Sequence, residues 1–526
     1  MNTPTDPLRL RQSTGRRQTA LKGRQRAALY RNLKKVFGLR QLRDGQEAVI
    51  GNVIAKRSTL AIMPTGAGKS LCYQLPALTL TGHTVVVSPL ISLMKDQADK
   101  LNEADVPAVV LNSTLSTSAE EEALQAIRDK KIQFIFTTPE QMTNAGLLDI
   151  LASQPINLLV VDEAHCISHW GHDFRPAFLE LGAARRALGA PPVLALTATA
   201  NQQVIDDIEQ QLGVSLDVIN TGVYRDNLHF KVHQITREDE RVQLALQAIA
   251  DIEGSGIVYT ATIKAATEMH RVLVESGESA AIYHGRLGAR RRHEQQDAFM
   301  AGDARVMVAT NAFGLGIDKP DIRFVVHLQL PPNLDAYYQE AGRAGRDGEA
   351  SRCLLIYFHE DRRLRQFQQL GRYPAAEDVI AVVSALRRPN AEAVAESDQA
   401  SDAKTAWISA KSLAEHLPVS KAKIQVGLHL LKQAGVIAQN RKRELRLINA
   451  IDDDAVRQLT QEYRERDDSD RSALEEMEFY ARTGYCRWKV LLDHFGESEA
   501  FERCGSCDNC ITPPIAQPLK RERETA

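Results

Sequence analysis

Several features that would assign the chain to a specialised class of protein are missing. No apolar run is long enough to span a bilayer, and the N-terminus lacks the apolar stretch of a secretory signal. Only seven cysteines occur in 526 residues, whereas disulfide frameworks belong to small secreted domains. No short repeat recurs at a fixed period. We therefore expect a globular, cytoplasmic protein with no membrane partner.

An excess of charge is also missing. The chain has 65 basic and 67 acidic residues, so any binding of nucleic acid must come from local basic patches. Basic residues do dominate the first forty positions, where Asp6 is the single acid. We interpret residues 1–26 as a disordered basic arm, with a transit peptide as the alternative. A chain of 526 residues is too long for one ordinary core, and several domains are expected.

Short β-branched runs alternate with helical stretches along most of the chain. Strands are predicted at 60–63, 84–88, 133–137, 158–161 and 193–196, and the pattern restarts at 256–259, 280–283, 305–309, 324–327 and 353–357. Strands separated by helices favour a parallel sheet with crossover connections. The sequence therefore predicts an α/β fold with two tandem parallel-sheet lobes, at 27–215 and 216–370.

The rest of the chain divides into smaller parts. Residues 371–470 contain a polar, alanine-rich linker around 389–405, and then two helical periods and a hairpin at 407–448. Residues 471–512 combine a helix with a cysteine cluster, and residues 513–526 are interpreted as a disordered tail.

The clearest chemical motif follows the first predicted strand and reads Met63-Pro64-Thr65-Gly66-Ala67-Gly68-Lys69-Ser70. A tight glycine loop between a strand and a helix turns backbone N–H groups toward phosphate oxygens. We expect the residues from Thr65 to Ser70 to bind ATP, with Lys69 reaching the β- and γ-phosphates and Ser70 coordinating Mg²⁺. Met63 replaces the first glycine of the usual motif, and an ordinary helix cap is the alternative.

Two further motifs favour a nucleoside triphosphatase. Asp162 and Glu163 follow the apolar run LLVV, so one carboxylate can lie near Mg²⁺ and the other can orient a water. A strand-to-helix turn capped by Asp162 is the alternative. Arg343 and Arg346, in QEAGRAGR, offer cations for the charge that develops on phosphate, with a solvated basic turn as the alternative. Because they are distant from the loop in sequence, they would have to reach it across a cleft, which couples hydrolysis to lobe closure.

These motifs carry a family resemblance. Residues 37–358 resemble the helicase core of superfamily 2, and more closely that of RecQ-type DNA helicases, which implies that both lobes are RecA-like. The most specific segment is VVDEAHCISHWGHDFRP at 160–176, since RecQ-type enzymes have an aromatic-rich loop directly after the DEAH box. Other segments that resemble family motifs contacting DNA or ATP are VVVSPLISLMKDQ (85–97), LALTATA (194–200), YHGRL (283–287) and VATNAFGLGIDKPDIRFVVH (308–327).

The resemblance implies an ATP-dependent DNA helicase that moves 3′ to 5′ on single-stranded DNA and unwinds duplexes in repair, recombination or fork maintenance. It implies that Trp170 and Phe174 stack on bases, and that Arg175 contacts a phosphate or a base. His169 belongs to the same DNA-binding loop, where the family usually has glutamine. A plain core role for Trp170 is the alternative.

The resemblance also assigns nucleotide-binding residues. FGLRQLRDGQ at 37–46 resembles the adenine-recognising motif, in which Gln46, helped by Arg43, reads the base. Leu39 replaces the usual aromatic of the family, which predicts looser nucleotide selectivity. Asp318 lies in the second-lobe segment implied to contact ATP, and Arg346 is the better candidate for the arginine finger.

Four cysteines near the C-terminal end form a metal-binding pattern. Their thiolates suit tetrahedral Zn²⁺, with an iron–sulfur cluster as the rival, and the residues are Cys486, Cys504, Cys507 and Cys510. WKVLLDHFGE and CGSCDNC resemble the zinc-binding domain of RecQ enzymes. We expect a structural role, in which the metal clamps helices to the second lobe.

The region before the cysteines departs from the usual RecQ order, in which the zinc element follows the second lobe almost at once and a winged helix follows the zinc. Here residues 371–470 intervene, and we predict a winged-helix-like insert at 407–448. Gly435 ends its second helix, and the tip Arg441-Lys442-Arg443 can meet DNA phosphates. Docking on a protein is the alternative role.

These observations predict an enzyme with ATP, Mg²⁺ and Zn²⁺ as cofactors. Its partners would be single-stranded and partly duplex DNA, with any repair-protein partners unidentified, and it would be nucleoid-associated if bacterial. Two rivals stay open: an RNA-directed or double-strand translocase, and a DNA-binding regulator with a retired motor. The aromatic-rich loop argues against the first, and the intact Lys69, Glu163 and Arg346 argue against the second.

Overall fold

The structure is a computed structural model, which describes residues 21, 23–168, 175–314, 319–369, 373–387, 407–440, 444–497 and 501–512. It divides into two compact units, one of residues 1–357 with 480–526 and one of residues 358–479. Several predicted features lie outside the described residues, namely most of the N-terminal arm, residues 169–174, Asp318, the 389–405 linker, residues 441–443 and the tail from 513.

The first sheet of the larger unit has seven strands in the order β3-β4-β2-β5-β6-β1-β7, and each strand is parallel to its neighbours. The strands are β1 Thr59–Ile62, β2 His83–Val87, β3 Ala108–Leu111, β4 Phe134–Thr137, β5 Ile156–Val161, β6 Val193–Thr197 and β7 Asp217–Asn220. The central strands are mostly apolar because both faces of the sheet are covered.

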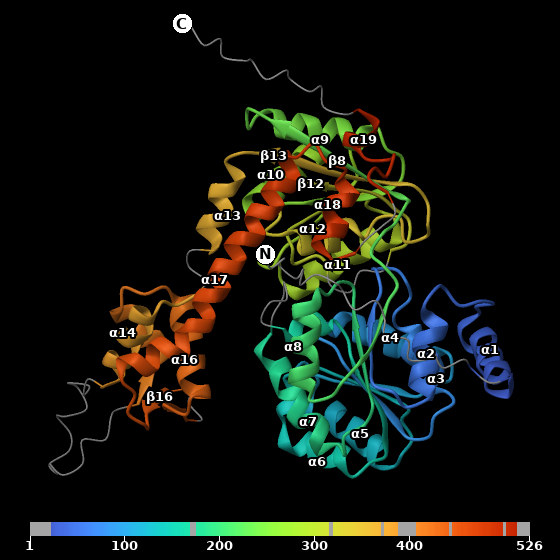
Figure 1. The fold of residues 1–526 in the computed structure, drawn as a ribbon, viewed down its shortest axis with the longest axis vertical. Helices are drawn as coiled ribbons and strands as arrows, with labels where there is room; N and C mark the ends of the chain where they lie inside the picture. The colour runs from blue at the N-terminus through green and yellow to red at the C-terminus, as the bar shows by residue number, and fades with distance from the viewer. Residues whose placement is uncertain are drawn as a thin grey trace, which may run out of the picture. The chain divides into compact units, whose positions relative to one another are not determined.

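Alternate strand residues pack into two separate cores. Leu60 and Ile62 face one core with α5 Thr117–Arg128, α6 Ala145–Ala152, α7 Leu181–Ala187 and α8 Gln202–Leu212. Ala61 and Met63 face the other core with α2 Gln46–Ile54, α3 Leu71–Ala77 and α4 Ile91–Glu103. Short 3-10 turns occur at Gln141–Thr143, Ala164–Ile167 and Pro176–Glu180. The helices thus lie around the first sheet on both sides (Figure 1).

The N-terminal helix α1 Gly23–Phe37 includes the last four residues of the predicted arm 1–26, and the structure describes little of the arm before it. Leu29 and Leu33 are buried in an apolar cluster with Ile50, Leu71 and Leu75 of α2 and α3. Arg26 adds an ion pair with Glu47 at 2.9 Å. Burial of one helix face therefore orders the chain from residue 23 onward, in spite of its basic composition.

The second sheet has six strands in the order β10-β11-β9-β12-β13-β8. The strands are β8 Leu228–Ile235, β9 Ser255–Tyr259, β10 Ala280–Tyr283, β11 Val306–Ala309, β12 Ile322–His327 and β13 Ser351–Phe358. Helices α9 Glu240–Ala250, α10 Ile263–Glu275, α11 Ala289–Ala301 and α12 Leu334–Ala341 connect them. The two predicted parallel-sheet lobes are thus confirmed, and each predicted strand begins and ends within two residues of its prediction.

The same unit includes α18 Arg487–His494 and α19 Asp508–Ile511, which flank the cysteine cluster. Among the residues that the structure describes, no helix has the length and apolar character needed to cross a membrane.

The smaller unit contains α13 Asp361–Gln369, α14 Ala376–Arg387, α15 Ala410–His416, α16 Lys421–Gln433 and most of α17 Asp453–Arg482. Strands β14 Ile408–Ser409, β15 Ile437–Gln439 and β16 Glu444–Leu447 form an antiparallel sheet around a small apolar core. Gly435 follows α16 with a φ of 67°, which confirms the predicted helix end. The predicted order of helix, helix and hairpin is present, and the predicted boundary at 470/471 falls inside α17.

Candidate functional site

A cavity of about 410 Å³ in the larger unit collects most of the predicted nucleotide-binding residues. Its lining combines segments of the first lobe with segments of the second. The predicted residues in this lining are Arg43, Gln46, Thr65, Gly66, Gly68, Lys69, Ser70, Asp162, Glu163, Arg343 and Arg346. Leu39 also lines the cavity, with a side chain that is 45% exposed.

The loop between β1 and α3 depends on two glycines. Gly66 and Gly68 have φ values of 86° and 80°, a conformation that other residues rarely adopt. A Cβ atom on Gly66 would lie 3.0 Å from Cγ of Arg346, so the second-lobe arginine packs directly on this loop. The Lys69 ammonium donates to the carbonyl of Met63 at 3.1 Å. Burial lowers the pKa of Lys69, while Glu163 and Asp162 act to raise it.

The residues expected at the adenine ring bind the loop backbone in this structure. Gln46 Nε2 donates to the carbonyls of Ala67 and Gly68, both at 3.0 Å, and its Oε1 accepts from the backbone N–H of Arg43 at 2.8 Å. The Arg43 guanidinium donates to the carbonyl of Gly66. These bonds fix the shape of the loop, a role that the sequence motif did not reveal.

The two carboxylates follow β5 at the edge of the first sheet. Asp162 accepts from the hydroxyl of Ser88 at 3.2 Å, and burial together with the Glu163 charge raises the pKa of Asp162 to about 7. Glu163 has a φ of 51°, in the left-handed region. Residues with such uncommon backbone conformations cluster at functional sites.

His165 is a site residue that sequence reasoning missed. Its Nδ1 lies 3.5 Å from Oε2 of Glu163 and 3.1 Å from Oγ1 of Thr197. Thr197 belongs to LALTATA, so one buried imidazole connects this segment to the carboxylates. The signal was present, since His165 is the last residue of the DEAH box.

The two arginines follow α12 in the second lobe and differ in their surroundings. Arg346 packs on Gly66, as described above, whereas Arg343 is buried beside Gly314. The Tyr259 hydroxyl donates to the carbonyl of Phe313 at 2.9 Å, and burial raises the pKa of Tyr259, while the Arg343 charge acts to lower it. Both arginines line the same cavity as the loop, and Arg346 is the one whose side chain packs on Gly66.

Of the predicted DNA-contacting residues, only Arg175 lies within the described part of the chain. Its side chain is partly exposed, and its backbone N–H donates to the carbonyl of Cys166 at 3.1 Å. The described residues do not include the other members of the set, which are His169, Trp170, Phe174, Arg441, Lys442 and Arg443.

The four clustered cysteines converge on one point. Their sulfur atoms all lie within 4.8 Å of one another. Backbone N–H groups of Cys504, Arg487 and Ser506 point at the sulfurs of Cys486, Cys507 and Cys504, at 3.3, 3.4 and 3.5 Å. Such donors stabilise thiolates, so the arrangement fits a tetrahedral metal ion with four sulfur ligands.

Family profiles match three parts of the chain. The DEAD/DEAH box helicase profile matches residues 43–208, the helicase conserved C-terminal domain matches 240–348, and the RecQ zinc-binding profile matches 443–511. The ATP-dependent DNA helicase RecQ of Synechocystis is 33% identical over 505 residues, which is 92% of this chain and 98% of that protein. The chain belongs to the RecQ family of DNA helicases. The zinc-binding profile begins ahead of α17, so this family region extends further back than the expected 471–512.

Other relatives cover less of their length. The chain is 45% identical to RecQ of Bacillus subtilis, and the matched region covers 64% of this chain and 57% of that protein. It is 39% identical to the probable helicase RecS of the same organism, over 68% of this chain and 73% of that protein.

Solved structures share the fold at low identity. Dbp5 of S. cerevisiae, bound to RNA and ADP BeF3, matches with a TM-score of 0.53 and 20% identity, over 62% of this chain and 87% of that one. The helicase Lhr of Mycobacterium smegmatis, bound to single-stranded DNA and AMP-PNP, matches with a TM-score of 0.52 and 19% identity, over 86% and 62%. These likenesses support the RecA-like fold of the two lobes.

Proposed function

We propose that the chain is an ATP-dependent DNA helicase that translocates on single-stranded DNA and separates duplexes. The observation that carries the proposal is that Lys69, Asp162, Glu163 and Arg346 line one and the same cavity, with Arg346 packed on the phosphate loop. Cations and carboxylates drawn from two lobes around one cavity suit hydrolysis of a terminal phosphate. Membership of the RecQ family supports DNA as the substrate.

Each group has a distinct task in this proposal. Lys69 binds the β- and γ-phosphates, and Glu163 orients the attacking water. Arg346 and Arg343 meet the negative charge that develops on the transferred phosphoryl group. Because the loop and the arginines belong to different lobes, nucleotide binding favours closure and product release favours opening.

A divalent cation fits the same cavity. The Ser70 hydroxyl and the Asp162 carboxylate are hard oxygen ligands of the kind that Mg²⁺ prefers, and both line the cavity. When bound, Mg²⁺ neutralises phosphate charge. Gln46 and Arg43 are proposed to read adenine through the atoms that the loop leaves available, and Asp318 is proposed to complete the nucleotide site.

The DNA-binding residues are proposals carried by the family resemblance. His169, Trp170, Phe174 and Arg175 would contact unpaired bases and phosphates. Movement 3′ to 5′ and a role in repair, recombination or fork maintenance come from the same source. An enzyme acting on DNA would work in the cytoplasm at the nucleoid if its source is bacterial.

The cysteine cluster is proposed to bind one structural Zn²⁺. Two of the four thiols are buried. Cys486 lies at the start of α18, Cys507 lies at the start of α19 and Cys510 lies within α19, so a bound ion would cross-link these two short helices.

The smaller unit is proposed to hold a winged-helix-like DNA contact. Helices α15 and α16 precede the β15–β16 hairpin, whose connection carries Arg441, Lys442 and Arg443. In β16, Arg446 lies 4.9 Å from the ring centre of Trp407, which adds a further cation to the described part of this sheet.

Two substitutions test the motor. Lys69→Ala should remove most ATP turnover, whereas Glu163→Gln should retain ATP binding but block hydrolysis. Turnover by either variant at the wild-type rate would contradict the site assignment. Comparison of ATPase stimulation by single-stranded DNA, duplex DNA and RNA tests the substrate, and unwinding of duplexes with 3′ or 5′ tails tests the polarity.

A further inference from the structure

The two sheets of the larger unit are joined by residues 221–227, between the end of β7 and the start of β8. We call this stretch the hinge segment. It does not line the nucleotide cavity. Its side chains and backbone nevertheless make hydrogen bonds to two other parts of the unit. These are the arginine-bearing turn, residues 342–346 after α12, and the cysteine-bearing element, residues 486–497 and 501–512.

Arg225 binds the arginine-bearing turn by its backbone. Its guanidinium donates to the carbonyls of Gly342 and Ala344, both at 2.8 Å, and to that of Gly345. Asn227 Nδ2 donates to the carbonyls of Gly345 and Glu349 at 2.8 and 2.9 Å. These carbonyls flank Arg343 and immediately precede Arg346, so one planar guanidinium fixes the orientation of the turn that presents both arginines.

The other end of the hinge segment is held by the cysteine-bearing element. Glu497, just after α18, accepts from the backbone N–H of Val223 at 2.8 Å and from Asn220 Nδ2 at 3.1 Å. The Tyr224 ring packs on Trp488 and Phe501, with ring centres 4.9 and 5.1 Å apart.

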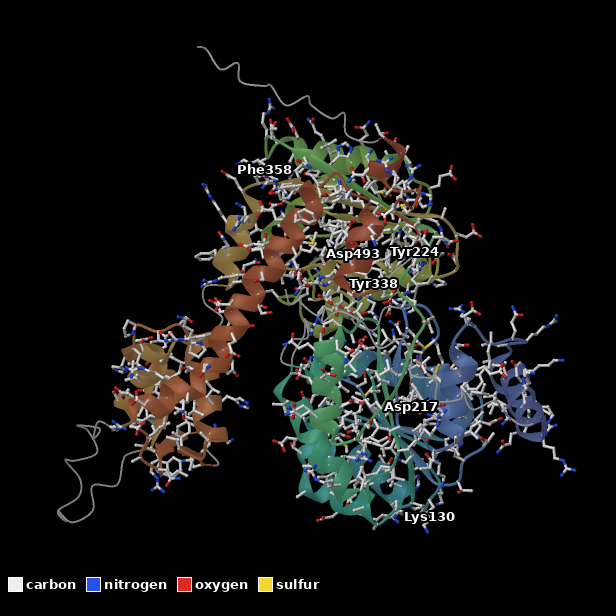
Figure 2. The ribbon with its side chains drawn as sticks, viewed as in Figure 1. Lys130, Asp217, Tyr224, Tyr338, Phe358 and Asp493 are labelled. Atoms are coloured by element: carbon white, nitrogen blue, oxygen red, sulfur yellow. The ribbon has the colours of Figure 1, made fainter. Side chains whose placement is uncertain are left out.

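Tyr338 of α12 also binds the hinge segment, since its hydroxyl donates to the carbonyl of Val223. Tyr224 and Tyr338, both labelled in Figure 2, contact the same indole ring, that of Trp488, with ring centres 4.9 and 6.2 Å apart. Val223, two residues before Arg225, is therefore held both by α12 and by the cysteine-bearing element.

We propose that Arg225 is a positioning residue for Arg343 and Arg346, and that the cysteine-bearing element keeps Arg225 in place by holding residues 220–224. The inference rests on the proposed role of the two arginines in hydrolysis. A turn that loses its three-carbonyl anchor can tilt, and misplacement of a catalytic group by about 1 Å costs on the order of 100-fold in rate. The phosphate loop belongs to the first lobe, so nucleotide affinity should change little.

The first test is Arg225→Lys, because a single ammonium cannot span three carbonyls as the guanidinium fork does. The kcat of DNA-stimulated ATP hydrolysis should fall roughly 10- to 100-fold, while KM for ATP stays within about twofold. The matched control is Arg305→Lys, at an arginine of the same lobe that also donates to backbone carbonyls, those of Ile249 at 2.9 Å and Ile252. This control should keep the wild-type kcat.

A double mutant separates positioning from general damage. If Arg225 acts through the two arginines, the loss of kcat in Arg225→Lys combined with Arg346→Ala should be smaller than the product of the two single losses, because only Arg343 is left to be misplaced. Multiplying effects, a large rise in KM, or an equal loss of kcat in Arg305→Lys would overturn the inference. If Arg225→Lys hydrolyses ATP at the wild-type rate while Arg346→Ala is inactive, the inference is overturned but the proposed function is not. An active Arg346→Ala would overturn the proposed function.

A second variant tests the contact between Glu497 and residues 220 and 223, and it changes no residue of the second lobe. Glu497→Ala removes both hydrogen bonds to residues 220 and 223 and should lower kcat on the order of 3- to 10-fold, with KM unchanged. Asp493→Asn is its control, since Asp493 pairs only with Lys489 among the described ion pairs, at 3.1 Å. An unchanged kcat in Glu497→Ala, or the same loss in Asp493→Asn, would overturn the role of the cysteine-bearing element.

Discussion

Replacement of Trp488 should detach the cysteine-bearing element from the second lobe. The Trp488 side chain is 0% exposed and packs on Tyr224, Phe230 and Tyr338, with ring centres 4.9, 5.0 and 6.2 Å apart. Its indole N–H donates to the carbonyl of Leu228 in β8 at 3.1 Å. Truncation of a buried tryptophan to alanine costs about 3–5 kcal/mol. Phenylalanine retains most of the packing but leaves the Leu228 carbonyl without this donor, which costs about 1–3 kcal/mol.

Amide hydrogen exchange measures this loss locally, which suits a chain of two units better than a single melting temperature. Since about 1.4 kcal/mol corresponds to a tenfold change, Trp488→Phe should speed exchange in β8 and α18 by roughly 10- to 100-fold. Trp488→Ala should speed it by a further factor of ten or more.

Trp407→Ala is the control, because Trp407 is 37% exposed and belongs to the smaller unit. We expect a cost below about 1 kcal/mol, from the lost contact with Arg446, and no change of exchange in β8. Exchange in β8 at the wild-type rate in Trp488→Ala would refute the reasoning, since it would mean that this packing does not hold the element on the lobe.

Further predictions address DNA and metal binding. Trp170→Ala should keep basal ATPase activity but lose stimulation by single-stranded DNA, and circular dichroism separates this result from unfolding. The purified protein should contain about one Zn²⁺ per chain, and Cys507→Ser should be metal-depleted and poorly folded; iron and a brown colour would contradict the assignment. Replacing Arg441, Lys442 and Arg443 with alanine should weaken duplex binding and unwinding, with a salt slope shallower by up to about one unit per lost contact, and should spare single-strand-stimulated ATPase. Unchanged duplex affinity would leave the insert as a spacer or a protein-docking unit.

Motifs whose residues are neighbours in the chain were predictable from sequence. The strand, glycine loop and helix around Lys69, the carboxylates after β5, and the cysteine spacing each depend on local backbone geometry and on the chemistry of adjacent side chains. Alternation of buried strands with helices likewise predicted both lobes. It did not predict that α1 begins at residue 23, because that helix is ordered by burial of Leu29 and Leu33 against residues far along the chain.

Only the tertiary structure decided how these pieces meet. The packing of Arg346 on Gly66, the bonds from Gln46 to the loop, and the anchoring of the 342–345 turn by Arg225 all join residues that are distant in sequence or use backbone carbonyls as acceptors. Every residue has such a carbonyl, so its use as an anchor leaves no pattern in the side-chain sequence. The chemistry of the site was therefore determined by residue identity, whereas its assembly was determined by the packing of the two lobes and the cysteine-bearing element.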